Sequence, residues 1–279
     1  MNTDRQELVQ IAQETLTILS RGVYCLPGVG AVSIQDTLST ACAHTQLHHP
    51  TEYNALVAQL PGLSPSTFTG INVSNRTTLA AGLELAQQFP SLACLNFASA
   101  KRPGGGFLNG SSAQEESLAR ASGLYATLQT QPEFYAYHRQ LGTSLYSSHV
   151  IFSPSVPVFR EDRGQLLAQP WQSSFLTAAA VNAGSMRGRG RGRHDKVGAA
   201  MEERIRMVLA VAAYHHCNAL VLGAWGCGVF RNDPNQIAHL FAKVLADPLF
   251  ENRFSHIEFA IYDPSSSLAI ITPFQKEFA

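Results

Sequence analysis

The sequence predicts an α/β fold, with a mixed, mostly parallel sheet flanked by helices and an N-terminal helical extension. From residue 68 onward, short apolar runs alternate with longer amphipathic segments, which is typical of strand–helix–strand units. Apolar residues make up 45% of the chain and charged residues 14%, which allows a large core. The chain of 279 residues is long for one ordinary domain. We therefore expect an extension over residues 1–66, packed on a core over residues 67–279.

The charge balance and the cysteines narrow the class of protein. Lys and Arg together number 20, as do Asp and Glu, so the net charge does not favour a nucleic-acid partner. The 5 cysteines include no CxxC pair, which favours free thiols in a reducing compartment. No signal-peptide pattern opens the chain, and no apolar run reaches about 18 residues. We expect a cytoplasmic protein that does not bind a membrane.

The extension is expected to begin with a helix and a hairpin. Apolar residues recur at three- and four-residue steps over residues 4–20, and Gly22 ends this helix. Residues 23–34 indicate a hairpin, whose GxG lacks the third glycine and the helix of a dinucleotide site. The histidines between residues 44 and 49 favour a polar surface over a metal site, because no carboxylate or thiolate accompanies them at a defined spacing.

Later elements follow from apolar runs bounded by glycine, proline or polar residues. We expect, in chain order, a helix at 51–59, a strand at 68–74, a helix at 77–89 capped by Ser74 or Asn75, strands at 92–97, 149–153, 158–164 and 172–180, a helix at 195–216, a strand at 219–222, a helix starting at Asn232-Asp233-Pro234, and a strand at 254–262 that closes the sheet. The low-complexity stretch Arg187–Arg193 fits either a basic contact to a polyanion or a solvated loop.

Three glycines and two glutamates follow the strand at 92–97. Consecutive glycines disfavour a helix or strand interior and allow backbone N–H groups to approach a ligand closely. Ser112 and Glu115 have the spacing of a capping box, which is the purely structural alternative. Glu116 points about 100° away from Glu115 on a helix, so it cannot share that cap and is placed to meet a ligand.

Loops that follow parallel strands meet at one edge of the sheet, where ligands bind. Asn75, the segment Ser99–Gly106 and the segment Gly223–Phe230 each follow a predicted strand. The last of these is rich in glycine and precedes a helix start, so its N–H groups can form an anion site. Two glycine loops on one rim can hold a diphosphate without net positive charge.

The pattern GGG, seven residues, QEE resembles the signature of poly(ADP-ribose) glycohydrolases. The stretches VIFSPSVPVFREDRG at 150–164 and LGAWGCGVFRNDP at 222–234 are similar to the bacterial-type branch of that family, whose core is a macrodomain. The resemblance implies a macrodomain-like fold that hydrolyses ribose–ribose O-glycosidic bonds and releases ADP-ribose from the polymer end. It implies no cofactor and no metal. We expect a monomer whose partners are poly(ADP-ribose), ADP-ribose and ADP-ribosylated macromolecules.

The resemblance also assigns roles to residues. Glu116 matches the catalytic general acid and base, and Glu115 matches the glutamate that positions ribose hydroxyls. The loop 223–230 would wrap the diphosphate, with Phe230 stacked on adenine, and the loop 99–106 would approach the distal ribose. The implied substrate-binding residues are Asn96, Ser99, Gly104, Gly105, Gly106, Gln114, Gly226, Cys227, Gly228, Val229 and Phe230.

Other functions remain open from the sequence. A non-catalytic ADP-ribose reader would keep both glycine loops without needing Glu116. A hydrolase that removes single ADP-ribose units from protein or nucleic acid would share the fold. A nucleotide-dependent oxidoreductase is disfavoured by the missing GxGxxG with its downstream acidic residue.

Overall fold

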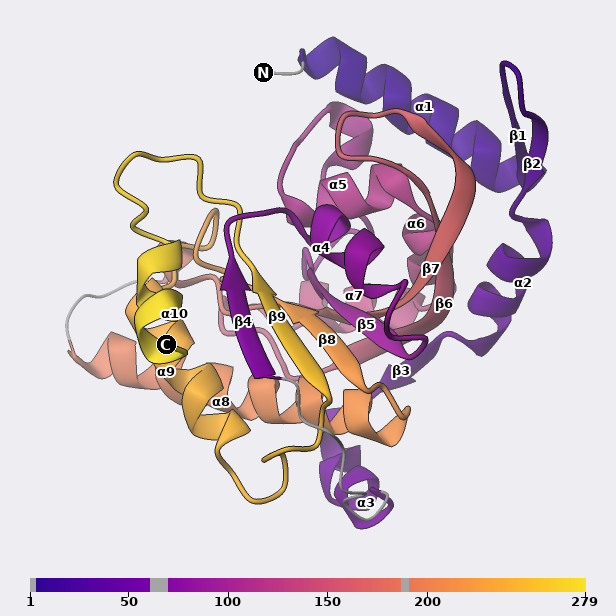
Figure 1. Ribbon diagram of the computed structural model, residues 1–279. Coiled ribbons are helices and arrows are strands. Elements are labelled where there is room, and N and C mark those ends of the chain that lie inside the picture. Colours follow the sequence, from indigo (N-terminus) through magenta and orange to yellow (C-terminus); the bar gives the residue numbers. More distant parts are fainter. Residues whose placement is uncertain (1–3, 61–69, 187–190) are drawn as a thin grey trace.

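The computed structural model describes residues 4–60, 70–186 and 191–279 and shows a seven-stranded sheet between helices (Figure 1). The strands are, in spatial order, β3 (Gln46–His48), β6 (Val150–Arg160), β7 (Leu166–Ala178), β5 (Leu92–Phe97), β8 (Ala219–Leu222), β9 (His256–Ala260) and β4 (Gly70–Ser74). Neighbours are parallel from β7 to β4, whereas β6 runs antiparallel to both β3 and β7. The predicted mixed, mostly parallel sheet is confirmed.

Successive side chains of each strand enter opposite helical layers. In β5, Ala93 and Leu95 join one core cluster, while Leu92 and Cys94 join the other. The first layer contains α3 (Tyr53–Ala58), α8 (Arg191–Tyr214), α9 (Pro234–Leu245) and α10 (Ile271–Glu277). The second contains α2 (Gln35–His44), α4 (Thr78–Leu85), α5 (Gln114–Ala121), α6 (Leu124–Gln129) and α7 (Pro132–Gln140). The short 3-10 turns are η1 (Pro50–Glu52), η2 (Phe107–Asn109) and η3 (Ala183–Ser185).

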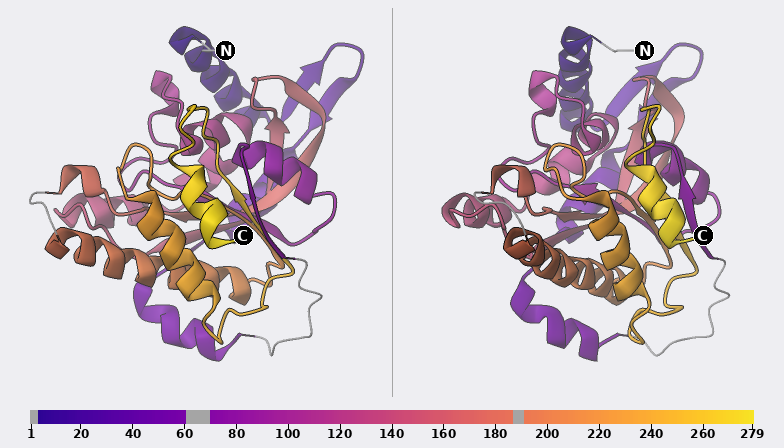
Figure 2. Two further views of the ribbon diagram at one scale, coloured as in Figure 1. Left: turned by 60° about the vertical axis from the view of Figure 1, so that its left-hand side comes forward. Right: turned by 90° about the vertical axis from the view of Figure 1, so that its left-hand side faces the viewer.

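The N-terminal extension begins as predicted. Helix α1 (Arg5–Arg21) is capped by the Asp4 side chain, and it ends at Gly22 in the left-handed region. A hairpin of β1 (Val23–Leu26) and β2 (Gly30–Ser33) follows. Figure 2 shows α1 and this hairpin at the end of the molecule opposite α3. The expected boundary at residues 66 and 67 lies outside the described residues.

The extension also contains two elements that were not predicted, α2 and β3. Helix α2 buries only Leu38 and Ala41, so its apolar signal is weak. Strand β3 is only 3 residues long and pairs with β6. The extension therefore supplies one edge strand of the main sheet.

Several predicted boundaries were wrong. The expected strands at 149–153 and 158–164 form one strand, β6, because a bulge between Ser153 and Val156 lets the strand continue past Pro154. Thr77, rather than Ser74 or Asn75, caps α4 by accepting the N–H of Ala80.

Helix α4 ends at Leu85, before the predicted end at residue 89. The strand expected at 254–262 was predicted to close the sheet at its edge. The corresponding strand, β9, lies inside the sheet, and β4 is the edge strand. Helix α8 begins at Arg191, earlier than predicted, while residues 187–190 of the basic stretch lie outside the described residues. No helix in the described ranges combines the length and apolar character needed to cross a bilayer.

Helix α1 packs on the segment that links β5 to α5. Ala12, Phe107 and Ala119 form a small buried cluster. The Arg5 Nε group donates to the carbonyl of Asn109 at 2.9 Å. The Thr15 hydroxyl donates to the carbonyl of Arg120 at 2.7 Å. The extension therefore holds the turn after the three glycines against the body of the protein.

Gly110 tests this contact, because it has φ 75° and a Cβ there would lie 2.6 Å from the Arg5 carbonyl oxygen. Gly28 is the matched control, since it has φ 77° and a Cβ there would meet nothing within 4 Å. We expect Gly28→Ala to lower the free energy of unfolding by about 1 kcal/mol, and Gly110→Ala by a further ~1–3 kcal/mol. Urea denaturation measures both. Equal losses would show that α1 does not constrain Gly110.

Candidate functional site

A cavity of about 730 Å³ opens at the carboxyl ends of β4, β5, β8 and β9. Its walls include Ser99, Gly105 and Gly106 from the first glycine loop and Gly226, Gly228 and Phe230 from the second. Two loops that are far apart in the sequence thus line one cleft, as the strand-end argument predicted.

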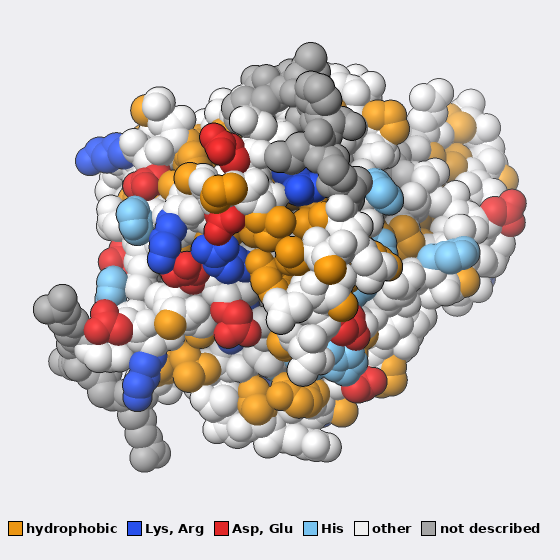
Figure 3. Space-filling view, turned by 90° about the horizontal axis from the view of Figure 1, so that it is seen from below, with side chains coloured by type: hydrophobic (Ala, Val, Ile, Leu, Met, Phe, Trp, Pro, Cys, Tyr) orange, Lys and Arg blue, Asp and Glu red, His pale blue; other side chains and the backbone are white. Residues whose placement is uncertain are grey.

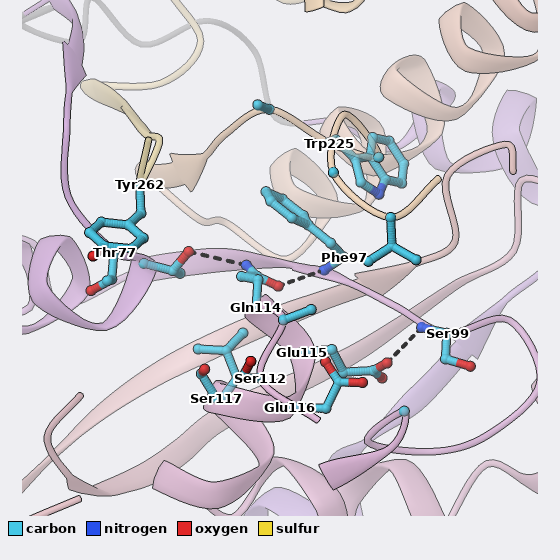
Figure 4. Close-up of a pocket in the computed structure, with 18 of the residues that line it drawn as sticks. Thr77, Phe97, Ser99, Ser112, Gln114, Glu115, Glu116, Ser117, Trp225 and Tyr262 are labelled. Atoms are coloured by element: carbon cyan, nitrogen blue, oxygen red, sulfur yellow. Dashed lines mark hydrogen bonds between the residues drawn. The ribbon is translucent and has the colours of Figure 1, made fainter. Parts of the chain in front are cut away.

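Gln114 fixes the start of α5 to the end of β5. Its amide nitrogen donates to the Leu95 carbonyl at 2.7 Å and to the Thr78 hydroxyl at 3.1 Å, and its amide oxygen accepts the Phe97 N–H at 2.9 Å. Figure 4 shows the Gln114 side chain joined to Phe97 by one of these hydrogen bonds. Although Gln114 lines the cavity, its polar atoms serve this attachment.

The capping-box alternative is wrong. The residue before α5 is Ala113, and no side chain caps this helix. Glu115 turns instead toward the first glycine loop, and its Oε2 accepts the Ser99 N–H at 2.6 Å (Figure 4). Tertiary contact thus overrides the local spacing of Ser112 and Glu115.

Glu116 also binds the first loop, through one oxygen only. Its Oε1 accepts the Gly106 N–H at 2.9 Å. In the described part of the chain, Oε2 forms no hydrogen bond or ion pair. The carboxylate is half-buried and lines the cavity. Glu116 therefore has one fixed oxygen and one that can meet a ligand.

Glu115 is almost fully buried, and this burial is the main reason its pKa is raised to about 8. The nearby Glu116 carboxylate raises the pKa further, while hydrogen bonds from Ser99, Asn96 and Gly104 oppose the rise. Asn96 is fully buried, outside the cavity lining, and donates to Thr177 Oγ1 at 3.2 Å. Its side chain supports Glu115 from behind.

The first loop needs glycine at its centre. Gly104 and Gly105 have φ 67° and 60°, a region that other residues rarely adopt. A Cβ on Gly105 would collide with the Glu116 Oε1 and would lie 3.0 Å from the Glu115 Oε2. The backbone thus passes both carboxylates more closely than any side chain permits.

The second loop lines the cleft and contains unpaired N–H groups. Among those that donate to no acceptor in the described part of the chain are the N–H groups of Gly226, Gly228, Val229 and Phe230. Asn232 is buried and holds the loop from beneath by donating its side-chain amide to the Val181 carbonyl at 3.0 Å and its N–H to the Gly226 carbonyl at 3.0 Å. Helix α9 starts just beyond, capped by Asp233 with Pro234 in the first turn, as predicted.

The remaining predicted residues of this loop point in different directions. Val229 is 78% exposed at the mouth of the cavity. Phe230 lines the cavity with its ring centroid 6.2 Å from that of Tyr146. Cys227 is outside the lining and packs against the core, where burial raises the pKa of its thiol.

The two glycine loops therefore offer different chemistry. In the first loop, the N–H groups of Ser99 and Gly106 are occupied by carboxylates. In the second, the N–H groups are available to an anion. The prediction that glycine loops hold phosphate through N–H groups therefore stays a prediction, and we keep it for the second loop, where these groups have no partner among the described residues.

Sequence reasoning missed residues at the other end of the cavity. Arg76, Thr77 and Tyr262 follow β4 and β9, so the same strand-end rule could have found them. Asp162 lies in the turn between β6 and β7 and accepts the Thr77 hydroxyl at 2.6 Å. Asn75, by contrast, donates to the Asp263 carbonyl at 2.9 Å and is outside the lining.

Nowhere in the described ranges do three potential metal ligands of the His, Cys, Asp or Glu type gather.

Comparison with known proteins identifies the family. The family model described as the microbial-type PARG catalytic domain, where PARG stands for poly(ADP-ribose) glycohydrolase, matches residues 12–161. The chain belongs to the microbial-type poly(ADP-ribose) glycohydrolase family. This membership confirms the resemblance carried by the GGG and QEE motifs.

Solved glycohydrolase structures agree with the whole fold. The enzyme from Thermomonospora curvata is 44% identical with a TM-score of 0.93, over 98% of this chain and 100% of that chain. The same enzyme bound to the inhibitor ADP-HPD is 43% identical with a TM-score of 0.90, over 98% of this chain and 100% of that chain. The Deinococcus radiodurans enzyme in complex with ADP-ribose is 42% identical with a TM-score of 0.80, over 90% of this chain and 97% of that chain. A search of curated proteins gave no match.

The raised pKa of Glu115 predicts a pH-dependent cost to stability. The unfolded chain releases this proton near pH 4.5 and the folded chain near pH 8, so the folded state loses stability as pH rises through that window. Glu115→Gln removes the ionisation and keeps the shape of the side chain. We expect the melting temperature of the variant, relative to the parent protein, to increase between pH 5 and pH 8. A difference that does not change with pH would contradict the buried neutral carboxyl.

Proposed function

We infer from family membership that the chain hydrolyses poly(ADP-ribose), and we propose that Glu116 performs the reaction at the polymer end. One observation carries the assignment to Glu116. Its carboxylate is held on the Gly106 N–H by one oxygen, and the second oxygen is unpaired in the described structure at the wall of a cleft large enough for a nucleotide sugar. Glu115, the other glutamate of the motif, has both carboxyl oxygens engaged, one by the Asn96 side chain and one by the Ser99 N–H.

Glu116 would act first as an acid and then as a base. Hydrolysis of a glycosidic bond passes through an oxocarbenium-like transition state, and a carboxylic acid assists by protonating the departing oxygen. The free oxygen of Glu116 would give its proton to the leaving ribose oxygen. The resulting carboxylate would then remove a proton from the water that attacks the anomeric carbon.

Glu115 would position the sugar next to the reacting bond. A buried carboxyl whose pKa is raised to about 8 is largely protonated at neutral pH, so it can donate a hydrogen bond as well as accept one. A ribose hydroxyl at the cleft wall offers both kinds of partner. Asn96 and the Ser99 N–H hold the carboxyl in place for this contact.

The second glycine loop would bind the diphosphate of the released unit. Its unpaired N–H groups supply the dipoles that a diphosphate needs without a net positive charge. Phe230 at the end of this loop would stack on the adenine, a contact worth about 1–3 kcal/mol.

A cytoplasmic location and a monomeric state complete the proposal. The 5 free cysteines support the former, and the monomeric state stays a prediction.

Replacement of Glu116 tests the catalytic assignment. We expect Glu116→Gln to lower turnover of poly(ADP-ribose) by at least about 10²-fold, because the amide cannot transfer a proton. Binding of ADP-ribose, measured by calorimetry, should persist. Glu7→Gln on the exposed side of α1 is the control and should match the parent protein. Chromatography of the products measures turnover.

The outcomes separate the alternatives. Activity retained by Glu116→Gln would refute its role. If the parent protein binds ADP-ribose but releases none from the polymer, the chain is a reader. Release of single units from modified proteins, with the polymer left intact, would indicate the mono-ADP-ribosyl hydrolase.

The carboxyl mechanism also predicts that activity does not require a metal ion. Protonation by Glu116 replaces the role that a Lewis acid has in metal-dependent hydrolysis. We expect the rate of ADP-ribose release to stay within about twofold of the untreated rate after dialysis against EDTA. A rate that collapses and returns on addition of a divalent ion would overturn this prediction.

A further inference from the structure

Two basic side chains lie at the catalytic end of the cleft and have no role in the reaction as described. Lys101 and Arg102 belong to the first glycine loop, are exposed, and line the cavity together with Glu116. Neither forms an ion pair with a carboxylate of the described residues. Both side chains are open to solvent, so they do not contribute to packing of the core.

The backbone that carries these side chains is fixed. Gly105 donates its N–H to the Arg102 carbonyl at 3.1 Å, which closes a turn. Arg139 on α7 donates from Nη1 to the Lys101 carbonyl at 3.0 Å. Arg139 is itself exposed, so its guanidinium is a third positive charge next to Lys101 and Arg102. Lys101 and Arg102 therefore emerge from a turn that is held by Arg139 of α7, the third cation.

Some basic residues elsewhere form ion pairs with acidic neighbours. Arg206 binds Asp247 at 2.7 Å, and Lys243 binds Glu202 at 2.8 Å, both on the face of α8 and α9. Several Lys and Arg side chains in Figure 3 likewise lie beside Asp or Glu side chains. Even Arg76, at the far end of the cleft, is paired with Glu258 and Glu84. Lys101 and Arg102, by contrast, line the cavity beside Glu116 and have no carboxylate partner among the described residues.

The direction of the cleft shows what this charge can meet. Figure 4 places Thr77 and Tyr262 on one side and Ser99, Glu115 and Glu116 on the other. With the anomeric carbon at Glu116, the unit to be released extends into the cleft, and the leaving ribose lies on the opposite side of Glu116. In poly(ADP-ribose) that ribose carries its own diphosphate one carbon beyond the ring. A dianion therefore follows the scissile bond closely.

We propose that Lys101, Arg102 and Arg139 form a subsite for the diphosphate of the adjoining ADP-ribose unit, the one that remains on the polymer. The proposal rests on the proposed function. Long, flexible cations at an exposed loop attract such an anion through a screened Coulomb interaction. The subsite would favour polymer over substrates that have a small uncharged group in place of the next unit.

The experiment compares two substrates in two matched double variants. One substrate is poly(ADP-ribose), and the other is ADP-ribose joined at its anomeric carbon to an uncharged aryl group whose release is measured by absorbance. The test variant is Lys101→Ala with Arg102→Ala. The control is Arg21→Ala with Lys276→Ala, which removes the same two charges from exposed positions outside the cavity lining.

We expect the ratio of kcat/KM for polymer to kcat/KM for the aryl substrate to fall about tenfold in the test variant at low ionic strength. The loss should shrink as salt is added, and the control should keep the parent ratio. An unchanged ratio, or an equal loss on both substrates, would overturn the subsite. If the parent protein cleaves neither substrate, the proposed function fails instead, so the two failures are distinguishable.

Discussion

The site depends on hydrogen bonds that join two carboxylates to one glycine loop. Glu115 takes the Ser99 N–H at 2.6 Å and Glu116 takes the Gly106 N–H at 2.9 Å. The loop can follow this path only because Gly104 and Gly105 adopt left-handed φ values. The carboxylates thus satisfy backbone donors that the turn would otherwise leave unpaired, and the turn holds the carboxylates at the cleft wall. Neither part has its conformation without the other.

The rest of the fold constrains this unit from three sides. Gln114 ties the start of α5 to β5. Arg120, one helical turn after Glu116, is buried and donates from Nη1 to the Ser111 carbonyl at 2.6 Å. Helix α1 closes the third side through Arg5 and Thr15. The N-terminal extension therefore helps to support the first glycine loop.

Patterns of neighbouring residues correctly predicted the parts of the site that depend only on short stretches of the chain. The apolar run of β5, the glycine loops and the Pro234 helix start were all predictable, because each depends on residues next to one another in the chain. The direction of a side chain is different. Asn96 and Gln114 were both expected to bind substrate, yet Asn96 is fully buried and the polar atoms of Gln114 bond to β5 and α4. The capping-box alternative failed for the same reason, since a distant N–H competes for Glu115 more effectively than its neighbours do.

The difference between the two loops explains how one cleft can bind a dianion and still contain a carboxylate pair. The N–H groups of Ser99 and Gly106 are already occupied by Glu115 and Glu116, whereas several N–H groups of the second loop have no acceptor among the described residues. A ligand held there by its diphosphate would reach Phe230 with its base and Glu116 with its distal ribose. The order of contacts along the cleft then repeats the order of groups along ADP-ribose.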